Sequence, residues 1–116
     1  MKEGKTFYTV GEICALTDVT RKTLFYYDRR GLLKPVQRTG SQQHKLYDND
    51  SLLKLRQIIR YRDAGLTIAE ITKLINDPEC DAEKILREAL QRIIGLKEQK
   101  EAEIIRLRQL IEELQQ

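Results

Sequence analysis

The chain has 116 residues, of which 41% are hydrophobic and 34% charged, and its formal net charge is +3. This length supports about one domain with a modest core. An apolar run long enough to cross a bilayer is absent, and the polar start is unlike a signal peptide. We therefore expect no membrane partner. Because the two cysteines, Cys14 and Cys80, form no paired motif, we also expect a cytoplasmic protein with free thiols.

The first predicted helix begins near residue 10. Thr9 and Glu12 have the T-x-x-E spacing of a capping box, in which each side chain accepts a hydrogen bond from a backbone donor. An apolar stripe at helical spacing follows, formed by Val10, Ile13 and Cys14. We therefore expect a helix that ends near residue 16, with Cys14 as a small core residue.

Residues 20–33 form the segment around which the chain is organised. Thr20 is a good helix cap, and Gly31 suits the left-handed conformation that ends a helix. Between them lie two cations at the start of the helix, Arg21 and Lys22, and a cluster of aromatic residues. Joined to the first helix by a short turn containing Val19, this segment predicts a helix-turn-helix whose second helix suits a DNA major groove.

Residues 34–47 are polar and carry Gly40 between stretches of extended-type residues, which predicts a β-hairpin. We call this segment the wing, because a hairpin beside a helix-turn-helix can contact flanking phosphates. The alternative is an ordinary surface loop. His44 is the only histidine and has no ligand-type neighbours at metal-binding spacing, so we expect no metal.

Two further helices are predicted beyond the wing. Asp48 caps the first, which runs from Asn49 to about Ala64, where Gly65 ends it. A second T-x-x-E capping box, at residues 67–70, begins the next helix and is followed by apolar residues on one face. Pro78 then interrupts the chain.

Residues 81–116 have no proline and a single glycine. Nine positions follow alternating steps of four and three, and seven of them are aliphatic, which is the pattern of a coiled coil. These seven predicted dimerisation residues are Leu86, Leu90, Ile93, Ile104, Leu107, Ile111 and Leu114. These residues form an apolar seam, which would be exposed to water in a single helix of about 54 Å. We therefore expect antiparallel pairing with a second copy. The competing interpretation is a helix that folds back on its own domain.

The charges are unevenly distributed. Residues 20–62 hold eleven Lys or Arg against three acids, a balance of +8, whereas residues 81–116 have a balance of −1. This distribution favours a basic N-terminal part, the head, that binds a polyanion, and a charge-mixed C-terminal part with a different function. The alternative is a solvated basic surface without a partner.

In this order, the pieces resemble the MerR family of bacterial transcription regulators. The resemblance rests on TVGEICALTDVTRKTLFYYDRRGLL, on the wing ending in HKLYD, on LLKLRQIIRYRDAGLTIAEITKLI, and on the long terminal helix. It implies a mainly α fold, with a winged helix-turn-helix DNA-binding domain at 6–76 and a dimerisation helix at 78–116. One departure is Phe25, where the family usually has an arginine before two aromatics.

The resemblance also implies a function. Family members act as homodimers on a palindromic promoter element, which they bend and untwist so that RNA polymerase can engage the promoter. Carried over by position, the residues expected at double-stranded DNA are Thr20, Arg21, Lys22, Tyr26, Tyr27, Arg38, His44, Lys45, Tyr47, Arg60 and Arg62. Of these, Tyr26 and Tyr27 are expected to contact the DNA backbone, pack between the helices, or both.

Metal-sensing relatives place one cysteine at the start of the dimerisation helix and more after its end. Cys80 matches the first position only, and one thiolate does not hold a metal tightly, so the sequence predicts no cofactor. An enzyme is not indicated, since the chain has no nucleophile–base pairing and no glycine-rich phosphate loop. The alternative to a sequence-specific regulator is a coiled-coil interaction or architectural protein with a non-specific nucleic-acid-binding head.

Overall fold

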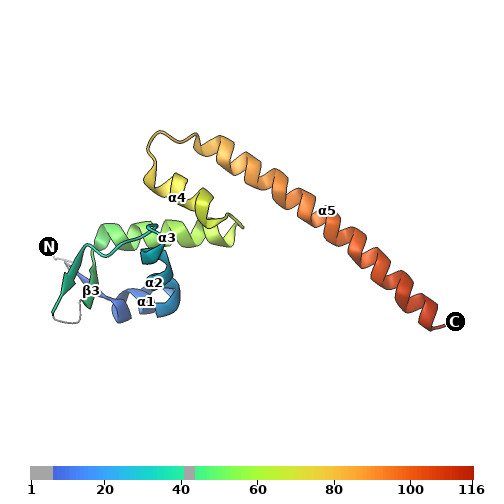
Figure 1. The fold of residues 1–116 in the computed structure, drawn as a ribbon, viewed down its shortest axis with the longest axis horizontal. Helices are drawn as coiled ribbons and strands as arrows, with labels where there is room; N and C mark the ends of the chain where they lie inside the picture. The colour runs from blue at the N-terminus through green and yellow to red at the C-terminus, as the bar shows by residue number, and fades with distance from the viewer. Residues whose placement is uncertain (1–6, 41–43) are drawn as a thin grey trace. The chain divides into compact units, whose positions relative to one another are not determined.

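The computed structural model describes residues 7–40 and 44–116, which divide into two compact units (Figure 1). The first unit ends at Cys80, and the second, Asp81–Gln116, is a single long helix. As predicted, the described chain is mainly helical with a small sheet. The predicted domain start at residue 6, the first five residues and the tip of the wing at 41–43 lie outside the described residues.

The helix-turn-helix consists of α1 (Val10–Thr17) and α2 (Arg21–Arg29). The first predicted capping box is present at the start of α1, and Thr20 caps α2 by accepting a hydrogen bond from the Thr23 backbone. Between the helices, Asp18 has a φ of 60° and donates its N–H to the Cys14 carbonyl at 2.8 Å. Aspartate tolerates this left-handed conformation better than most residues, so the turn is tight without a glycine.

The wing is a β-hairpin, as predicted, formed by β2 (Gln37–Thr39) and β3 (His44–Tyr47). A third strand, β1 (Tyr8–Thr9), pairs with the other side of β3, so the sheet order is β1-β3-β2 and all pairings are antiparallel. Because β1 leads directly into α1, the sheet connects the wing to the helix-turn-helix.

The second helix pair is α3 (Asn49–Asp63) and α4 (Ile68–Asn76). Asp48 caps α3 by accepting from the Ser51 backbone at 2.9 Å, and the second predicted capping box begins α4. Both helix starts therefore lie where the sequence placed them.

One hydrophobic core joins these elements. It contains Val10 and Ile13 from α1, Val19 from the turn, and residues of α2, β3, α3, α4 and the segment after α2. The others are Leu24, Tyr27, Leu32, Leu33, Tyr47, Leu55, Ile58 and Ile71. Cys14 packs against this core, as expected. Because α2 contributes two of its side chains to the core, the opposite side of α2 faces outwards.

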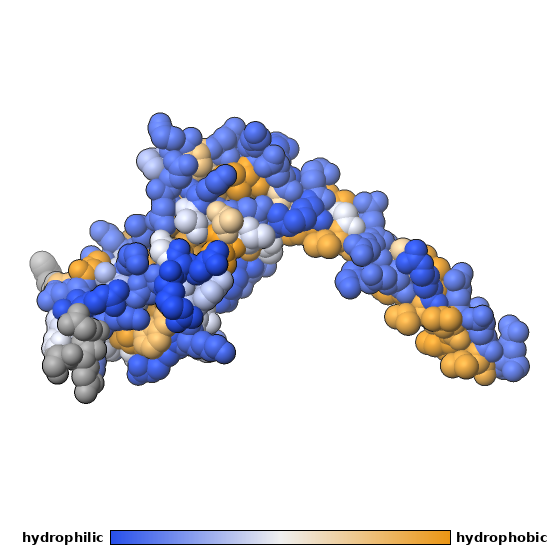
Figure 2. Space-filling view, viewed as in Figure 1, coloured by the Kyte–Doolittle hydropathy of each residue, from blue (hydrophilic) through white to orange (hydrophobic). Residues whose placement is uncertain are grey.

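The second unit is α5 (Ala82–Leu114), 33 residues long and capped by Asp81. Most of its surface is exposed, and Figure 2 shows apolar surface gathered along one side of its last turns. None of the helices in the described ranges is long and apolar enough to cross a membrane.

Candidate nucleic-acid interface

The N-terminal end of α2 presents three exposed polar residues, Thr20, Arg21 and Lys22. The Thr20 hydroxyl lies 3.1 Å from the Thr23 nitrogen and 3.0 Å from its hydroxyl, which fixes the first turn. Since Leu24 is fully buried, the helix cannot roll to hide this end. An anchored helix with an exposed cationic N-terminus is the arrangement with which helix-turn-helix proteins contact base edges.

Arg21 lies beside the start of α1. A Cβ at Gly11 would come within 3.3 Å of an Arg21 guanidinium nitrogen, so the absence of a side chain at Gly11 leaves room for Arg21. A cleft of about 620 Å³ opens here between the start of α1, α2 and the wing, and both Arg21 and His44 line it. Lys45 lines it too, so the fold brings together three predicted DNA-binding residues that are up to 24 positions apart in sequence.

The two adjacent tyrosines of α2 have different surroundings. Tyr26 is exposed, and the guanidinium carbons of Arg29 and Arg30 each lie 5.9 Å from its ring centroid. Tyr27 is buried in the core, and a hydrogen bond with its side chain raises the pKa of Arg62 against the opposing effect of burial. Of the two predicted roles, Tyr27 therefore packs between helices, while Tyr26 offers a surface.

The wing is joined to α2 by one buried carboxylate, that of Asp28. An Arg38 nitrogen and the Lys45 ammonium each lie 3.1 Å from its Oδ2, and the Lys34 ammonium lies 3.6 Å from Oδ1. Burial raises the pKa of Asp28, but the hydrogen bonds from Lys45 and Arg38 outweigh it and hold the pKa below its ordinary value. Sequence reasoning missed this role, although Asp28 is the only acid in residues 20–47.

Lys45 is held from a second side. Its ammonium lies 3.9 Å from the centroid of the Phe25 ring, a cation–π contact, and its side chain is only 20% exposed. Arg38 is 39% exposed and Lys34 65% exposed. Of the three cations around Asp28, Lys45 has the least surface to offer to DNA.

Tyr47 has no accessible surface at all, since its relative exposure is 0%. This replaces its predicted contact with DNA from the wing by a packing role in the core. Its hydroxyl has no hydrogen-bond partner among the described residues, and burial, with Asp28 nearby, raises the pKa of Tyr47 to about 12.

The remaining predicted DNA-binding residues lie on α3. Arg60 is exposed and donates to the Gln57 side chain at 2.8 Å, and Arg62 lies 3.3 Å from the Asp63 carboxylate. The Arg62–Asp63 contact is an exposed ion pair of the kind that contributes little free energy, so a phosphate can replace it.

Six of the seven predicted dimerisation residues on α5 are exposed, and Ile93 is half-buried. Four aliphatic residues outside the predicted seam are exposed as well: Ile94, Leu96, Ile105 and Leu110. The apolar surface of α5 is therefore broader than one coiled-coil seam. Sequence reasoning missed its width because only positions in steps of four and three were counted.

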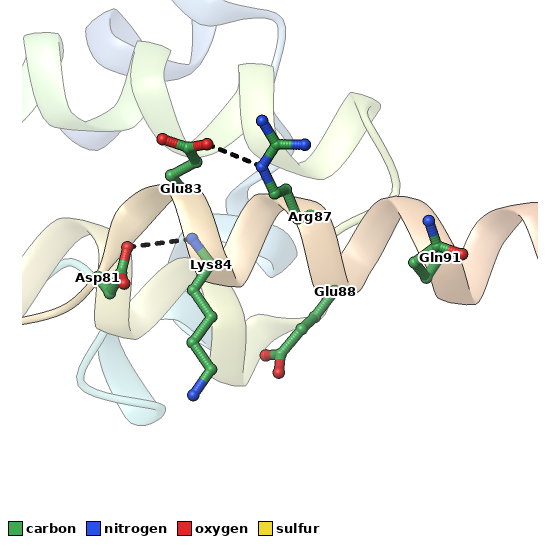
Figure 3. Close-up of a pocket in the computed structure, with 6 residues that line it drawn as sticks. All are labelled: Asp81, Glu83, Lys84, Arg87, Glu88 and Gln91. Carbon is green, nitrogen blue, oxygen red and sulfur yellow. Dashed lines mark hydrogen bonds and ion pairs between the residues drawn. The ribbon is translucent and has the colours of Figure 1, made fainter.

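The cap Asp81 and the first turns of α5 line a hollow whose six residues are polar or charged (Figure 3). Asp81 accepts from the Lys84 backbone at 3.1 Å, and Arg87 donates to Glu83 at 2.8 Å. The described part of the chain has no cluster of three or more residues suited to hold a metal ion.

Comparison with known proteins identifies the family to which this chain belongs. Residues 8–77 match the sequence profile of the MerR HTH family regulatory proteins. The chain belongs to the MerR family. MerR proteins are DNA-binding transcription regulators and not enzymes. The family resemblance inferred from the sequence is therefore confirmed.

Individual MerR relatives agree with this assignment. The transcriptional activator TipA of Streptomyces coelicolor is 38% identical over 80 residues, which are 69% of this chain and 31% of TipA. A MerR-family regulator from Bacillus cereus is 33% identical with a TM-score of 0.68, over 85% of this chain and 74% of that one. EcmrR, solved as an EcmrR–DNA complex in EcmrR-RPo, is 33% identical with a TM-score of 0.64, over 77% of this chain and 34% of EcmrR. The chain thus spans about a third of the length of the curated relatives that it matches.

Proposed function

We propose that this MerR-family chain is a sequence-specific transcriptional regulator that acts as a homodimer on a palindromic promoter element. The observation that carries the proposal is the exposed cationic start of α2, anchored by a buried face and placed in one unit with a wing. The structural neighbour EcmrR was solved with DNA, which supports the same type of partner here.

Each element has a task in this proposal. The start of α2 enters the major groove, where Arg21 reads a guanine edge and Lys22 contacts a base or a nearby phosphate. The wing, through Arg38 and His44, and α3, through Arg60 and Arg62, neutralise flanking phosphates. These phosphate contacts fix the register of the protein on DNA and add affinity without reading sequence. Tyr26 contacts the DNA backbone.

The dimer in this proposal forms through α5. Its exposed aliphatic residues repeat at coiled-coil spacing and lose their contact with water when a second copy packs against them. Two identical heads then meet a site with two-fold symmetry. We further propose that the dimer bends and untwists the promoter in the cytoplasm and acts with RNA polymerase, a complex of which is among the structural neighbours.

The alternative is an interaction or architectural protein whose basic head binds without sequence preference. Titration of labelled duplex DNA at several salt concentrations separates the two. A regulator gives a linear fall of log K with log salt on every duplex and, in addition, a preferred sequence bound at least about 1,000-fold more tightly than random DNA. Equal affinity for all duplexes would support the architectural alternative, and a lack of salt dependence would exclude DNA as the partner.

A further inference from the structure

The Asp28 carboxylate is the centre of a charged cluster that belongs to two elements. Asp28 lies in α2, beside the proposed DNA-reading end, whereas Lys34, Arg38 and Lys45 all come from the wing. Arg38 and Lys45 are also directly opposite each other in the β2–β3 pairing. One carboxylate therefore holds both strands of the wing at α2.

The contacts of Lys45 show that this cluster is built rather than incidental. Its ammonium has the Asp28 oxygen at 3.1 Å and the Phe25 ring centroid at 3.9 Å. Phe25 and Asp28 are three positions apart on α2, the spacing that places two side chains on one helix face. A phenylalanine at position 25 gives Lys45 a ring to lie on, whereas an arginine there would repel it.

The same cations are what a DNA phosphate would attract. Asp28 is 5% exposed, so it cannot itself approach DNA, but it neutralises part of the wing charge and fixes where that charge lies. Cations held in place suit one arrangement of phosphates, whereas freed cations on flexible side chains follow any duplex.

We propose that Asp28, together with Phe25, is a positioning residue that locks the wing to α2 and so sets the specificity of DNA binding while restraining non-specific affinity. This rests on the proposed function, because specificity has meaning only if the chain reads a DNA sequence. We call the contacts of Asp28 and Phe25 with the wing the lock. Lys45 then serves mainly within the lock, and Arg38 and Lys34 are the wing cations that reach phosphates.

The test is Asp28→Asn, compared with Asp50→Asn. Both variants remove one negative charge in the same unit, but Asp50 is exposed and lies in the first turn of α3, outside the cluster. For Asp28→Asn we expect binding to random duplex DNA to tighten by roughly fivefold at 0.1 M salt, as about one more phosphate contact would give. The ratio of specific to random affinity should fall at least about tenfold. Asp50→Asn should leave this ratio unchanged.

A folding defect would give a different result, since it weakens binding to specific and random DNA alike. That outcome, or an unchanged ratio in Asp28→Asn, would overturn the proposal. Phe25→Leu keeps the apolar bulk and removes the ring, so it should lower the ratio in the same direction but by less.

A second measurement requires no DNA. Amide hydrogen exchange of β2 and β3, relative to α3, should accelerate in Asp28→Asn and not in Asp50→Asn. Unchanged exchange would refute the lock whatever the protein binds. If wild-type protein shows a locked wing but no preferred DNA sequence, the proposed function fails and the role in specificity fails with it, while the lock itself stands.

Discussion

At the scale of single residues, burial decides which predicted contacts remain available for DNA. Tyr26 and Tyr27 are neighbours in sequence, yet one is exposed and the other lies in the core. Tyr47 and Lys45 are both in β3. Tyr47 is buried in the core, and Lys45 contacts Asp28 and the ring of Phe25 within the protein. The residues left to act on DNA are those with free polar surface, above all Arg21.

Arg21→Ala is expected to weaken binding to the preferred site by about 1–3 kcal/mol and to relax specificity at one base pair. The reason is that a bidentate contact to guanine discriminates against other bases, whereas a phosphate contact does not. Binding curves on the preferred site, on single-base variants and on random DNA measure both effects. Equal losses on all of these sequences would mean that Arg21 contacts phosphate only.

Tyr47→Phe is expected to leave stability unchanged or raise it by up to about 1 kcal/mol, because the buried hydroxyl it removes has no partner among the described residues. Thermal or denaturant unfolding measures this. Tyr26→Phe, which makes the same change at an exposed ring, is the matched control and should have no effect. A loss of more than about 1 kcal/mol in Tyr47→Phe would show that the hydroxyl is hydrogen-bonded.

At the scale of elements, capping residues in the sequence predicted where the helices begin. The capping residues Thr9, Thr20, Asp48 and Thr67 all stand where their helices begin, because a cap acts on backbone donors within three residues. The pairing of β1 with β3 joins residues 39 and 37 positions apart, and the Asp28 cluster joins α2 to the wing. Such contacts depend on the tertiary fold, so periodicity and caps did not predict them.

Asp48→Ala should destabilise the first unit by about 1 kcal/mol at neutral pH, since α3 loses its cap. A hydrogen bond from the Ser51 backbone is the main reason that the pKa of Asp48 lies below its ordinary value of 3.8, despite the opposing effect of partial burial. The folded carboxyl therefore contributes stability above this pH, and the contribution is lost as the pH falls through the lowered pKa.

Unfolding midpoints of wild type and Asp48→Ala should accordingly converge below about pH 4. Asp48→Asn is the control, because asparagine caps a helix without titrating, and it should retain most of the stability at neutral pH. A constant difference between wild type and Asp48→Ala across this range would contradict the assigned role of the carboxylate.

At the scale of the whole molecule, the chain consists of a basic head and a charge-balanced helix, and the proposed function needs both. In that proposal the head supplies the DNA contacts, and α5 supplies apolar surface that a second copy would cover. The sequence predicted this division through its charge distribution and its seven-residue repeat.

Leu107→Asp should convert the proposed dimer to monomers, because a charge in the apolar seam would be desolvated on pairing. Gln109→Asp adds the same charge two residues away on the other side of α5 and should remain dimeric. Light scattering measures the mass of each variant. An unchanged mass for Leu107→Asp, or dissociation of Gln109→Asp alone, would contradict pairing through this seam.

The most direct test of the central claim is selection of bound sequences from a pool of random duplex DNA by the wild-type protein. A sequence-reading homodimer is predicted to enrich a site with two-fold symmetry, whose half-sites are separated by a fixed spacing. Enrichment of an asymmetric site, or of no sequence above the starting pool, would contradict the account of this chain as a dimeric, sequence-specific regulator.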